Sequence, residues 1–353
     1  MNFNYLFQSF KLILSLFMYN DNKPPKLLVK THYYNGVNNM STPVKVIISK
    51  KDAKKNIILY PGASPAGEDH PKMDMLGRLL SKLGFTVYIP RIPPLKKLNI
   101  TETNIEWFIS FYKWILDNQK VNPNKILMIG ISYGGAIMLR SVFDMDKTLP
   151  KPKTMLCYGT FSNGQTMLNF LINGELIING KKFNVTPHEW GLIVIFHNFL
   201  NNLQLDWEKK DLLKTIEYRI NEDMELCESS LKQLPEFQKI LYKSIIDRNI
   251  NDEVKDLTNK MIENEKKCLE HLSPINWANQ IENKVFIIHG ANDSMVPYTE
   301  SIKLAKVLPN SELFISYLYE HNEISTNRGV FFISKEIIRL IIFYYKLFKH
   351  YGD

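Results

Sequence analysis

The sequence predicts an α/β protein with a mainly parallel eight-stranded sheet flanked by helices, and two observations lead to this prediction. Over much of the 353 residues, short apolar runs alternate with helical runs of ten or more residues. Such alternation is typical of crossover connections between parallel strands. In addition, a strand-like run at residues 125–129, apolar at 126–129, passes through a sharp G-x-S-x-G turn into a helical run at 136–143. The eight strands are expected at residues 27–34, 44–48, 56–60, 85–89, 125–129, 155–158, 285–289 and 313–318.

The chain opens with an amphipathic helix at residues 3–18. It is too short to span a bilayer and lacks the basic start and cleavage site of a secretory signal. Two interpretations stay open: the helix packs on the protein's own surface, which its single cation, Lys11, favours, or it lies in a membrane interface. The apolar stripe contains Phe3, Leu6, Phe7, Phe10, Ile13, Leu14 and Phe17, opposite Asn4, Gln8, Lys11 and Ser15.

The first three strands are expected to form an antiparallel lead-in to the sheet. The loop at residues 61–71, PGASPAGEDHP, follows the third strand at its carboxyl end, where loops of open α/β sheets line the ligand crevice. Further helices are expected at 73–83 and 102–118.

Between residues 161 and 274 the alternation stops, and runs rich in helix formers take its place. We interpret this stretch as a helical insertion between two strands of one sheet, placed as a cap over the strand ends. The alternation then resumes, with helices at 301–307 and 331–348. The predicted division is an N-terminal helix (1–20), a core (21–160 and 275–353) and a cap (161–274).

Composition excludes several function classes. The net charge of +8 comes from lysines spread along the chain, with no run of like charges that would mark a nucleic-acid arm. Cys157, Cys227 and Cys268 lie far apart without a C-x-x-C pair, which indicates a reducing, cytoplasmic compartment and no metal site.

The serine turn calls for a base and an acid, since an unassisted serine is a poor nucleophile. Ser132 stands where a strand turns into a helix, so its hydroxyl is presented at the positive end of that helix. Asp293 follows the strand at 285–289, and His321 follows the strand at 313–318. The rivals are Glu320 as the acid and His70 as the base.

These residues resemble the α/β-hydrolase superfamily. The matching segments are Gly130–Gly135 (GISYGG), His289–Pro297 (HGANDSMVP) and His321, in the chain order serine, aspartate, histidine. The resemblance covers about residues 44–160 and 275–350. It implies that Asp293 orients His321, that His321 takes the proton of Ser132, and that the amides of Tyr133 and Ala63 form an oxyanion hole. Ser64 is the alternative second donor.

The leading hypothesis is therefore a cofactor-independent, metal-free serine hydrolase that acts on a small-molecule carboxylic ester through an acyl-enzyme. The alternatives are a peptidase or acyltransferase of the same fold, and a non-catalytic binding protein that kept the fold. Ser64 and His70 are expected near the substrate, and Trp190, Phe196 and Phe199 are open as acyl-pocket or core residues.

Overall fold

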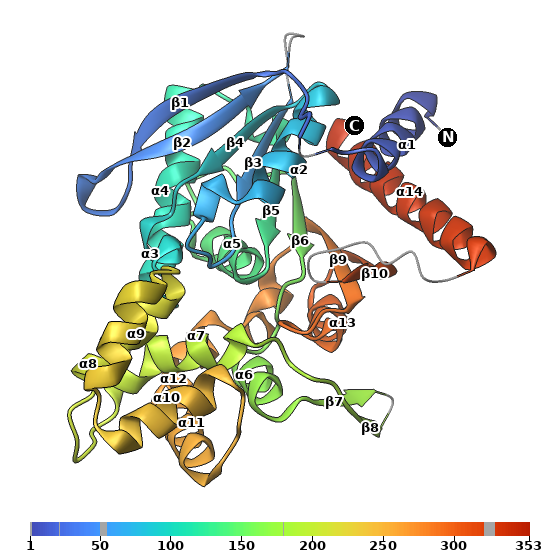
Figure 1. Ribbon diagram of the computed structural model, residues 1–353. Helices are drawn as coiled ribbons and strands as arrows, with labels where there is room; N and C mark the ends of the chain where they lie inside the picture. Colours follow the sequence, from blue (N-terminus) through green and yellow to red (C-terminus); the bar gives the residue numbers. More distant parts are fainter. Residues whose placement is uncertain (1, 21, 50–54, 179, 321–328) are drawn as a thin grey trace.

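An eight-stranded, mostly parallel sheet forms the centre of the molecule in the computed structural model, which describes residues 2–20, 22–49, 55–178, 180–320 and 329–353 (Figure 1). The strand order is β1-β2-β4-β3-β5-β6-β9-β10, and the expected sheet of eight strands is confirmed. The strands are β1 (Leu28–Asn35), β2 (Ser41–Ile48), β3 (Asn56–Tyr60), β4 (Thr86–Pro90), β5 (Ile126–Ile131), β6 (Thr154–Tyr158), β9 (Lys284–Asn292) and β10 (Ser311–Glu320).

The predicted antiparallel lead-in is right for two strands and wrong for the third. β1 pairs antiparallel with β2, and β2 pairs antiparallel with β4. β3, in contrast, is parallel to both of its neighbours, β4 and β5, in the middle of the sheet. All five residues of β3 are buried, as expected for a strand covered by helices on both faces.

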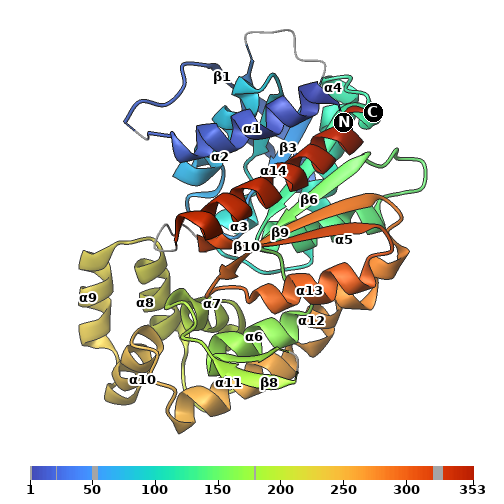
Figure 2. The ribbon, with the colours of Figure 1, turned by 90° about the vertical axis from the view of Figure 1, so that its right-hand side faces the viewer.

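Helices cover both faces of the sheet (Figures 1 and 2). On one face, α1, α2 and α14 pack in a cluster that includes Leu12, Leu80 and Leu340. On the other, α4, α5 and α13 pack in a cluster that includes Phe108, Ala136 and Leu304. Across the described ranges, no helix combines the length and the apolar character needed to cross a membrane. The bounds are α1 (Phe3–Phe17), α2 (Pro71–Lys82), α3 (Pro93–Lys96), α4 (Thr103–Asn118), α5 (Tyr133–Asp144), α13 (Tyr298–Val307) and α14 (Val330–Gly352).

The segment between β6 and β9 forms a mainly helical layer beyond the carboxyl ends of the strands, with a hydrophobic cluster of its own (Figure 1). We call it the insertion. It also contains a two-stranded hairpin, β7–β8, which the purely helical expectation missed. That it acts as a cap stays a prediction. Its elements are α6 (Gly164–Asn173), β7 (Glu175–Ile178), β8 (Lys181–Asn184), α7 (Trp190–Phe199), α8 (Lys210–Ile220), α9 (Met224–Gln233), α10 (Glu236–Ile246), α11 (Asp252–Asn264) and α12 (Lys266–Leu272).

Candidate active site

Ser132 occupies a strained turn between β5 and α5. Its backbone has φ 51° and ψ −126°, a conformation that costs a non-glycine residue about 1–3 kcal/mol and persists only where the surroundings enforce it. Three hydrogen bonds do so here. The Ser132 amide donates to the Tyr158 carbonyl at 2.7 Å, and the Ser132 carbonyl accepts from the Thr160 hydroxyl at 3.2 Å and the Gly135 amide at 3.0 Å. The Ser132 hydroxyl makes no capping hydrogen bond to the amides of α5, so the turn presents it without using it to cap the helix.

Two glycines of the motif are required by close backbone contacts. A Cβ on Gly134 would lie 2.2 Å from the Pro61 carbonyl oxygen, and one on Gly130 would lie 2.5 Å from the Gly135 Cα. Neither neighbour can move aside easily, because both are backbone atoms. The motif therefore brings α5 against β5 and the loop at 61–63 against the serine turn.

The two predicted oxyanion donors come from α5 and from the same loop. Tyr133 is the first residue of α5, so its amide has no acceptor within the helix. Gly62 packs beside the nucleophile, since a Cβ built on it would lie 3.3 Å from the Ser132 Cβ. The Ser64 amide donates to the Leu95 carbonyl at 3.1 Å and is thus already engaged. This geometry favours Ala63 over Ser64 as the partner of Tyr133.

Asp293 directly follows β9 and is buried, with 5% of its surface exposed. Its Oδ1 accepts hydrogen bonds from the amides of Met295 at 2.8 Å and Val296 at 2.9 Å, which fix the carboxyl group. A Cβ built on Gly159 would lie 3.5 Å from Oδ2. Oδ2 thus faces the end of β6, the strand between β9 and β5, and it also lies 3.4 Å from His289 Nε2. Asp293 and Ser132 therefore stand at the same edge of the sheet, one strand apart.

Two histidines near this edge, His289 and His70, differ in how many structural hydrogen bonds their ring nitrogens make. His289 is fully buried, with Nδ1 at 2.7 Å from the Ser301 hydroxyl and Nε2 at 2.8 Å from the Val296 carbonyl oxygen. His70 caps α2, where its Nδ1 accepts from the Lys72 amide at 3.2 Å. Burial, with a smaller contribution from Lys72, lowers the pKa of His70.

The predicted base, His321, lies outside the described residues, and its role stays a prediction. The side chain of Glu320, the rival acid at the end of β10, is likewise outside the description. Sequence reasoning did not single out Thr160, whose hydroxyl helps to hold the Ser132 carbonyl. The contact between Thr160 and Ser132 arises from the pairing of β5 with β6, and no local sequence pattern predicts it.

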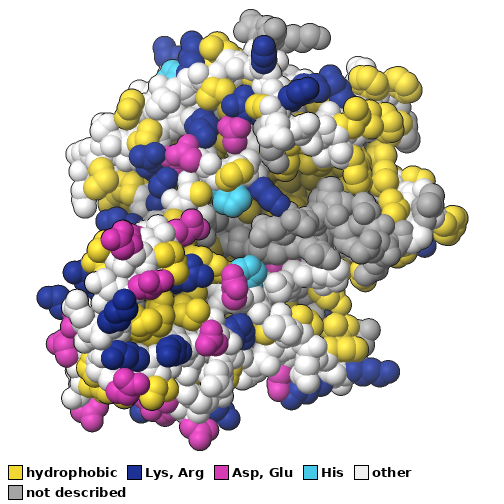
Figure 3. All heavy atoms as spheres, viewed as in Figure 1, with side chains coloured by type: hydrophobic (Ala, Val, Ile, Leu, Met, Phe, Trp, Pro, Cys, Tyr) yellow, Lys and Arg dark blue, Asp and Glu magenta, His cyan; other side chains and the backbone are white. Residues whose placement is uncertain are grey.

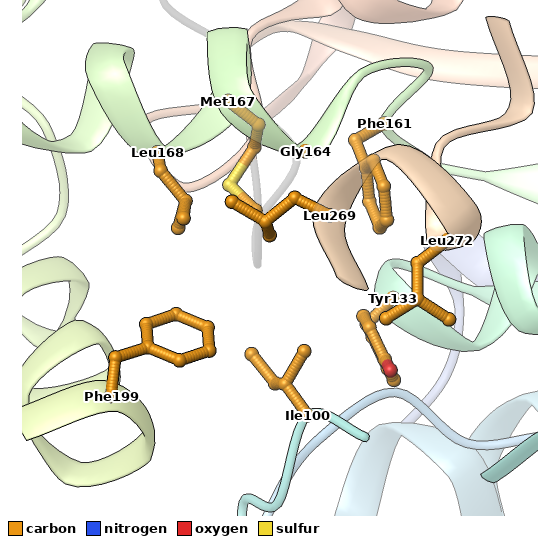
Figure 4. A pocket seen from close by; sticks show the side chains of 9 residues that line it. All are labelled: Ile100, Tyr133, Phe161, Gly164, Met167, Leu168, Phe199, Leu269 and Leu272. Carbon is orange, nitrogen blue, oxygen red and sulfur yellow. The ribbon is translucent and has the colours of Figure 1, made fainter. Parts of the chain in front are cut away.

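A small apolar cavity of about 20 Å³ lies where the insertion meets the core next to the serine turn (Figure 4). Tyr133 directly follows Ser132 and points into it from α5, while Phe161 directly follows Thr160. Of the aromatic residues considered from sequence, Phe199 lines this cavity, whereas Phe196 is buried in the cluster of the insertion. The lining residues are Ile100, Tyr133, Phe161, Gly164, Met167, Leu168, Phe199, Leu269 and Leu272.

Although the surface that lines the cavity is apolar, Tyr133 also has a buried hydroxyl. It accepts a hydrogen bond from the Asn104 side-chain amide at 3.3 Å, and burial raises its pKa. The hydroxyl therefore stays neutral at physiological pH. The cavity is suited to a small apolar group rather than to a charged one.

Comparisons with known proteins agree with this architecture. The BD-FAE family, an α/β-hydrolase-type esterase domain, matches residues 230–308, a segment that includes Asp293. Among curated protein sequences, none matches this chain significantly.

Many solved structures share the arrangement of elements, an esterase and a peptidase among them. Carboxyl esterase 2 from the mycorrhizal fungus Tuber melanosporum is similar with a TM-score of 0.53 and 10% identity, over 93% of this chain and 88% of the esterase. The acylaminoacyl peptidase of Pyrococcus horikoshii is similar with a TM-score of 0.52 and 14% identity, over 94% of this chain. This chain spans only 42% of the peptidase's length.

Proposed function

We propose that this chain, which has the α/β-hydrolase fold, is a serine hydrolase that cleaves carboxylic esters. The observation that carries the proposal is the enforced positive φ of Ser132 at the turn from β5 into α5. A protein that used this turn only for structure would relieve the strain with glycine. Here a serine occupies it, with backbone amides beside it.

The proposed reaction passes through an acyl-enzyme. The Ser132 hydroxyl oxygen attacks the acyl carbon while His321, oriented by Asp293, takes the hydroxyl proton. The amides of Tyr133 and Ala63 donate to the resulting oxyanion. Collapse of this intermediate breaks the ester bond, and His321 returns its proton to the departing alcohol. A water that gives a proton to His321 then attacks the acyl carbon. The bond to the Ser132 oxygen breaks, His321 returns the proton to that oxygen, and the carboxylic acid leaves.

The cavity supports a short, apolar acyl group. A volume of about 20 Å³ holds little more than one water-sized group, so a long chain would require side chains of the insertion to move. The insertion acts in this proposal as the cap that closes the acyl site. Esters of short acyl groups, acetyl above all, are therefore the expected substrates, ahead of long-chain lipid esters.

The test is labelling with a fluorophosphonate, which forms a covalent adduct only with an activated serine. The expected result is one adduct at Ser132, absent in Ser132→Ala, with hydrolysis of p-nitrophenyl butyrate reduced by several orders of magnitude. Ser64→Ala is the matched control, because it removes a neighbouring serine but keeps the backbone amide. A wild-type protein without an adduct, or a Ser132→Ala protein of unchanged activity, would refute the proposal and favour a non-catalytic binding protein.

A comparison of two histidine variants identifies the general base. His321→Ala should abolish labelling, whereas His70→Ala should retain it, because His70 is engaged as a helix cap. The opposite pattern would make His70 the base.

The second candidate is peptide hydrolysis, which the likeness to the acylaminoacyl peptidase supports. Ester hydrolysis ranks first because the esterase is matched over most of its length and the peptidase over less than half. Rates on p-nitrophenyl esters and on short peptide anilides, compared for the same preparation, distinguish the two.

A further inference from the structure

Helices α1 and α14 lie side by side and antiparallel along one flank of the molecule, with the two chain ends together (Figures 1 and 2). The Asn2 amide donates to the Tyr345 hydroxyl at 3.1 Å, and Tyr5 packs against Gly352. α1 buries Leu12 and Ile13 in the cluster it shares with α14. The expected packing of the N-terminal helix on the protein's own surface is therefore observed.

This packing leaves a second apolar stripe of α1 in solvent, next to an apolar stripe of α14. Phe3 is 77% exposed on α1, and Phe331 is 86% exposed on α14. Hydrophobic side chains gather over these two helices in Figure 3. Contiguous exposure of this kind marks an interaction surface rather than scattered surface residues. We call it the α1/α14 face, made of Phe3, Phe7, Phe10, Leu14, Phe17, Met18, Phe331, Ile338 and Ile342.

Cations predominate around this face, although the exposed Asp353 lies near Tyr5 where α14 ends. α1 contains Lys11 and no acidic residue. On α14 the cations are exposed, whereas the carboxylate of Glu336 is 2% exposed and pairs with Arg339. Lys346 pairs with Glu312 of β10. The exposed cations of α14 are Lys335, Arg339, Lys346 and Lys349.

We propose that the α1/α14 face docks this protein on the surface of a bilayer that contains anionic lipids. Both helices lie in the plane of the interface, the phenylalanines enter the boundary between headgroups and acyl chains, and the lysines contact lipid phosphates and carboxylates. A second copy of the chain fits less well, because a two-fold contact would bring the same cations together from both sides.

The experiment is co-sedimentation of the full chain with vesicles of phosphatidylcholine and phosphatidylserine, and with vesicles of phosphatidylcholine alone. Phe7→Ser/Phe10→Ser should weaken binding to the anionic vesicles at least about tenfold, since two exposed phenylalanines no longer insert. Phe237→Ser on α10 is the matched control, because its ring is 47% exposed and that of Phe10 is 51% exposed. Lys335→Glu/Lys349→Glu should weaken binding to anionic vesicles by a similar factor and change binding to neutral vesicles little.

Circular dichroism melting verifies that the variants fold, which is expected because every substituted side chain is exposed. The proposal is overturned if the wild-type chain does not sediment with anionic vesicles, or if Phe237→Ser weakens binding as much as the α1 pair. It is also overturned if the vesicle-free protein is a dimer that Phe7→Ser/Phe10→Ser dissociates, because a second copy would then occupy the face. Reactivity of Ser132 with a fluorophosphonate is read separately and is expected to be the same in all these variants.

Discussion

Replacing Glu300 should destabilise the fold strongly, although this residue lies outside the proposed triad. Glu300 is in the first turn of α13 and only 1% exposed. Its Oε2 accepts from the Ser162 amide at 3.1 Å, the Ser162 hydroxyl at 2.8 Å and the Asn163 amide at 2.9 Å. Its Oε1 accepts from the Thr166 hydroxyl at 2.8 Å and the Lys303 ammonium at 2.7 Å. One carboxylate thus fixes the connection through which the chain leaves β6 and enters the insertion.

The magnitude follows from the donors left behind. Glu300→Ala leaves two backbone amides and a hydroxyl buried without a hydrogen-bond acceptor, and it removes the ion-pair partner of Lys303. Breaking such a buried pair costs about 3–5 kcal/mol of folding stability. Glu300→Gln keeps one oxygen for Ser162 and Asn163, so we expect about 1–2 kcal/mol. Lys303→Ala is the control: this lysine is half exposed, and its removal leaves four of the five hydrogen bonds, for a loss of about 1 kcal/mol or less.

The effect should depend on pH. Burial raises the pKa of Glu300, but Lys303 and the hydrogen bonds outweigh burial, and the net pKa lies below the ordinary value of 4.5. The ionised carboxylate therefore contributes its full stability above pH 4.5, and this contribution is lost as the pH falls through the lower value of the folded state. Urea unfolding followed by tryptophan fluorescence at neutral and acidic pH measures both effects. A Glu300→Ala protein within about 0.5 kcal/mol of wild type at neutral pH would refute the reasoning.

Three further predictions concern the serine turn, the cavity and a thiol. Gly134→Ala should abolish fluorophosphonate labelling, since its Cβ would meet the Pro61 carbonyl oxygen. Gly329→Ala, whose Cβ would meet no atom of the described residues within 4 Å, should label normally. Met167→Ala enlarges the apolar cavity and should raise kcat/KM for hexanoyl relative to acetyl esters about tenfold; an unchanged ratio would exclude the cavity as the acyl site. Burial raises the pKa of Cys157 to about 12, so Ellman's reagent at pH 8 should modify this thiol only after unfolding, and rapid reaction of the native protein would contradict that burial.

Local pattern was sufficient for most of the sheet and for the serine turn. The apolar run at 126–129 lies within β5, and the glycines around Ser132 are needed for contacts that the motif itself implies. Pairing direction is not local, and the antiparallel placement of residues 56–60 was wrong for that reason. The continuous apolar run of β3, buried on every residue, was the available signal for a central parallel strand.

The insertion shows a different limit. Its helical runs were visible, but the β7–β8 hairpin was not predicted, although the Asn179-Gly180 pair between two short β-compatible runs is a hairpin signal. Gly180 does adopt a positive φ of 75°. The contacts of Glu300 with Ser162 and Thr166 had no sequence signal, because they join segments more than a hundred residues apart.

The N-terminal helix shows why periodicity cannot decide between packing and exposure. Helical spacing placed Phe3, Phe10 and Ile13 on one apolar stripe. In the fold this stripe is only partly buried. Ile13 packs with Leu12 against α14, whereas Phe3 and Phe10 are exposed to solvent. When the apolar stripe of a helix is wider than the contact made by one neighbouring helix, part of the stripe is buried and the rest stays exposed to solvent. The choice posed by the sequence, between packing on the protein and lying on a membrane, therefore need not be exclusive, because α1 packs one face on α14 and leaves another face exposed, which we propose lies on a membrane.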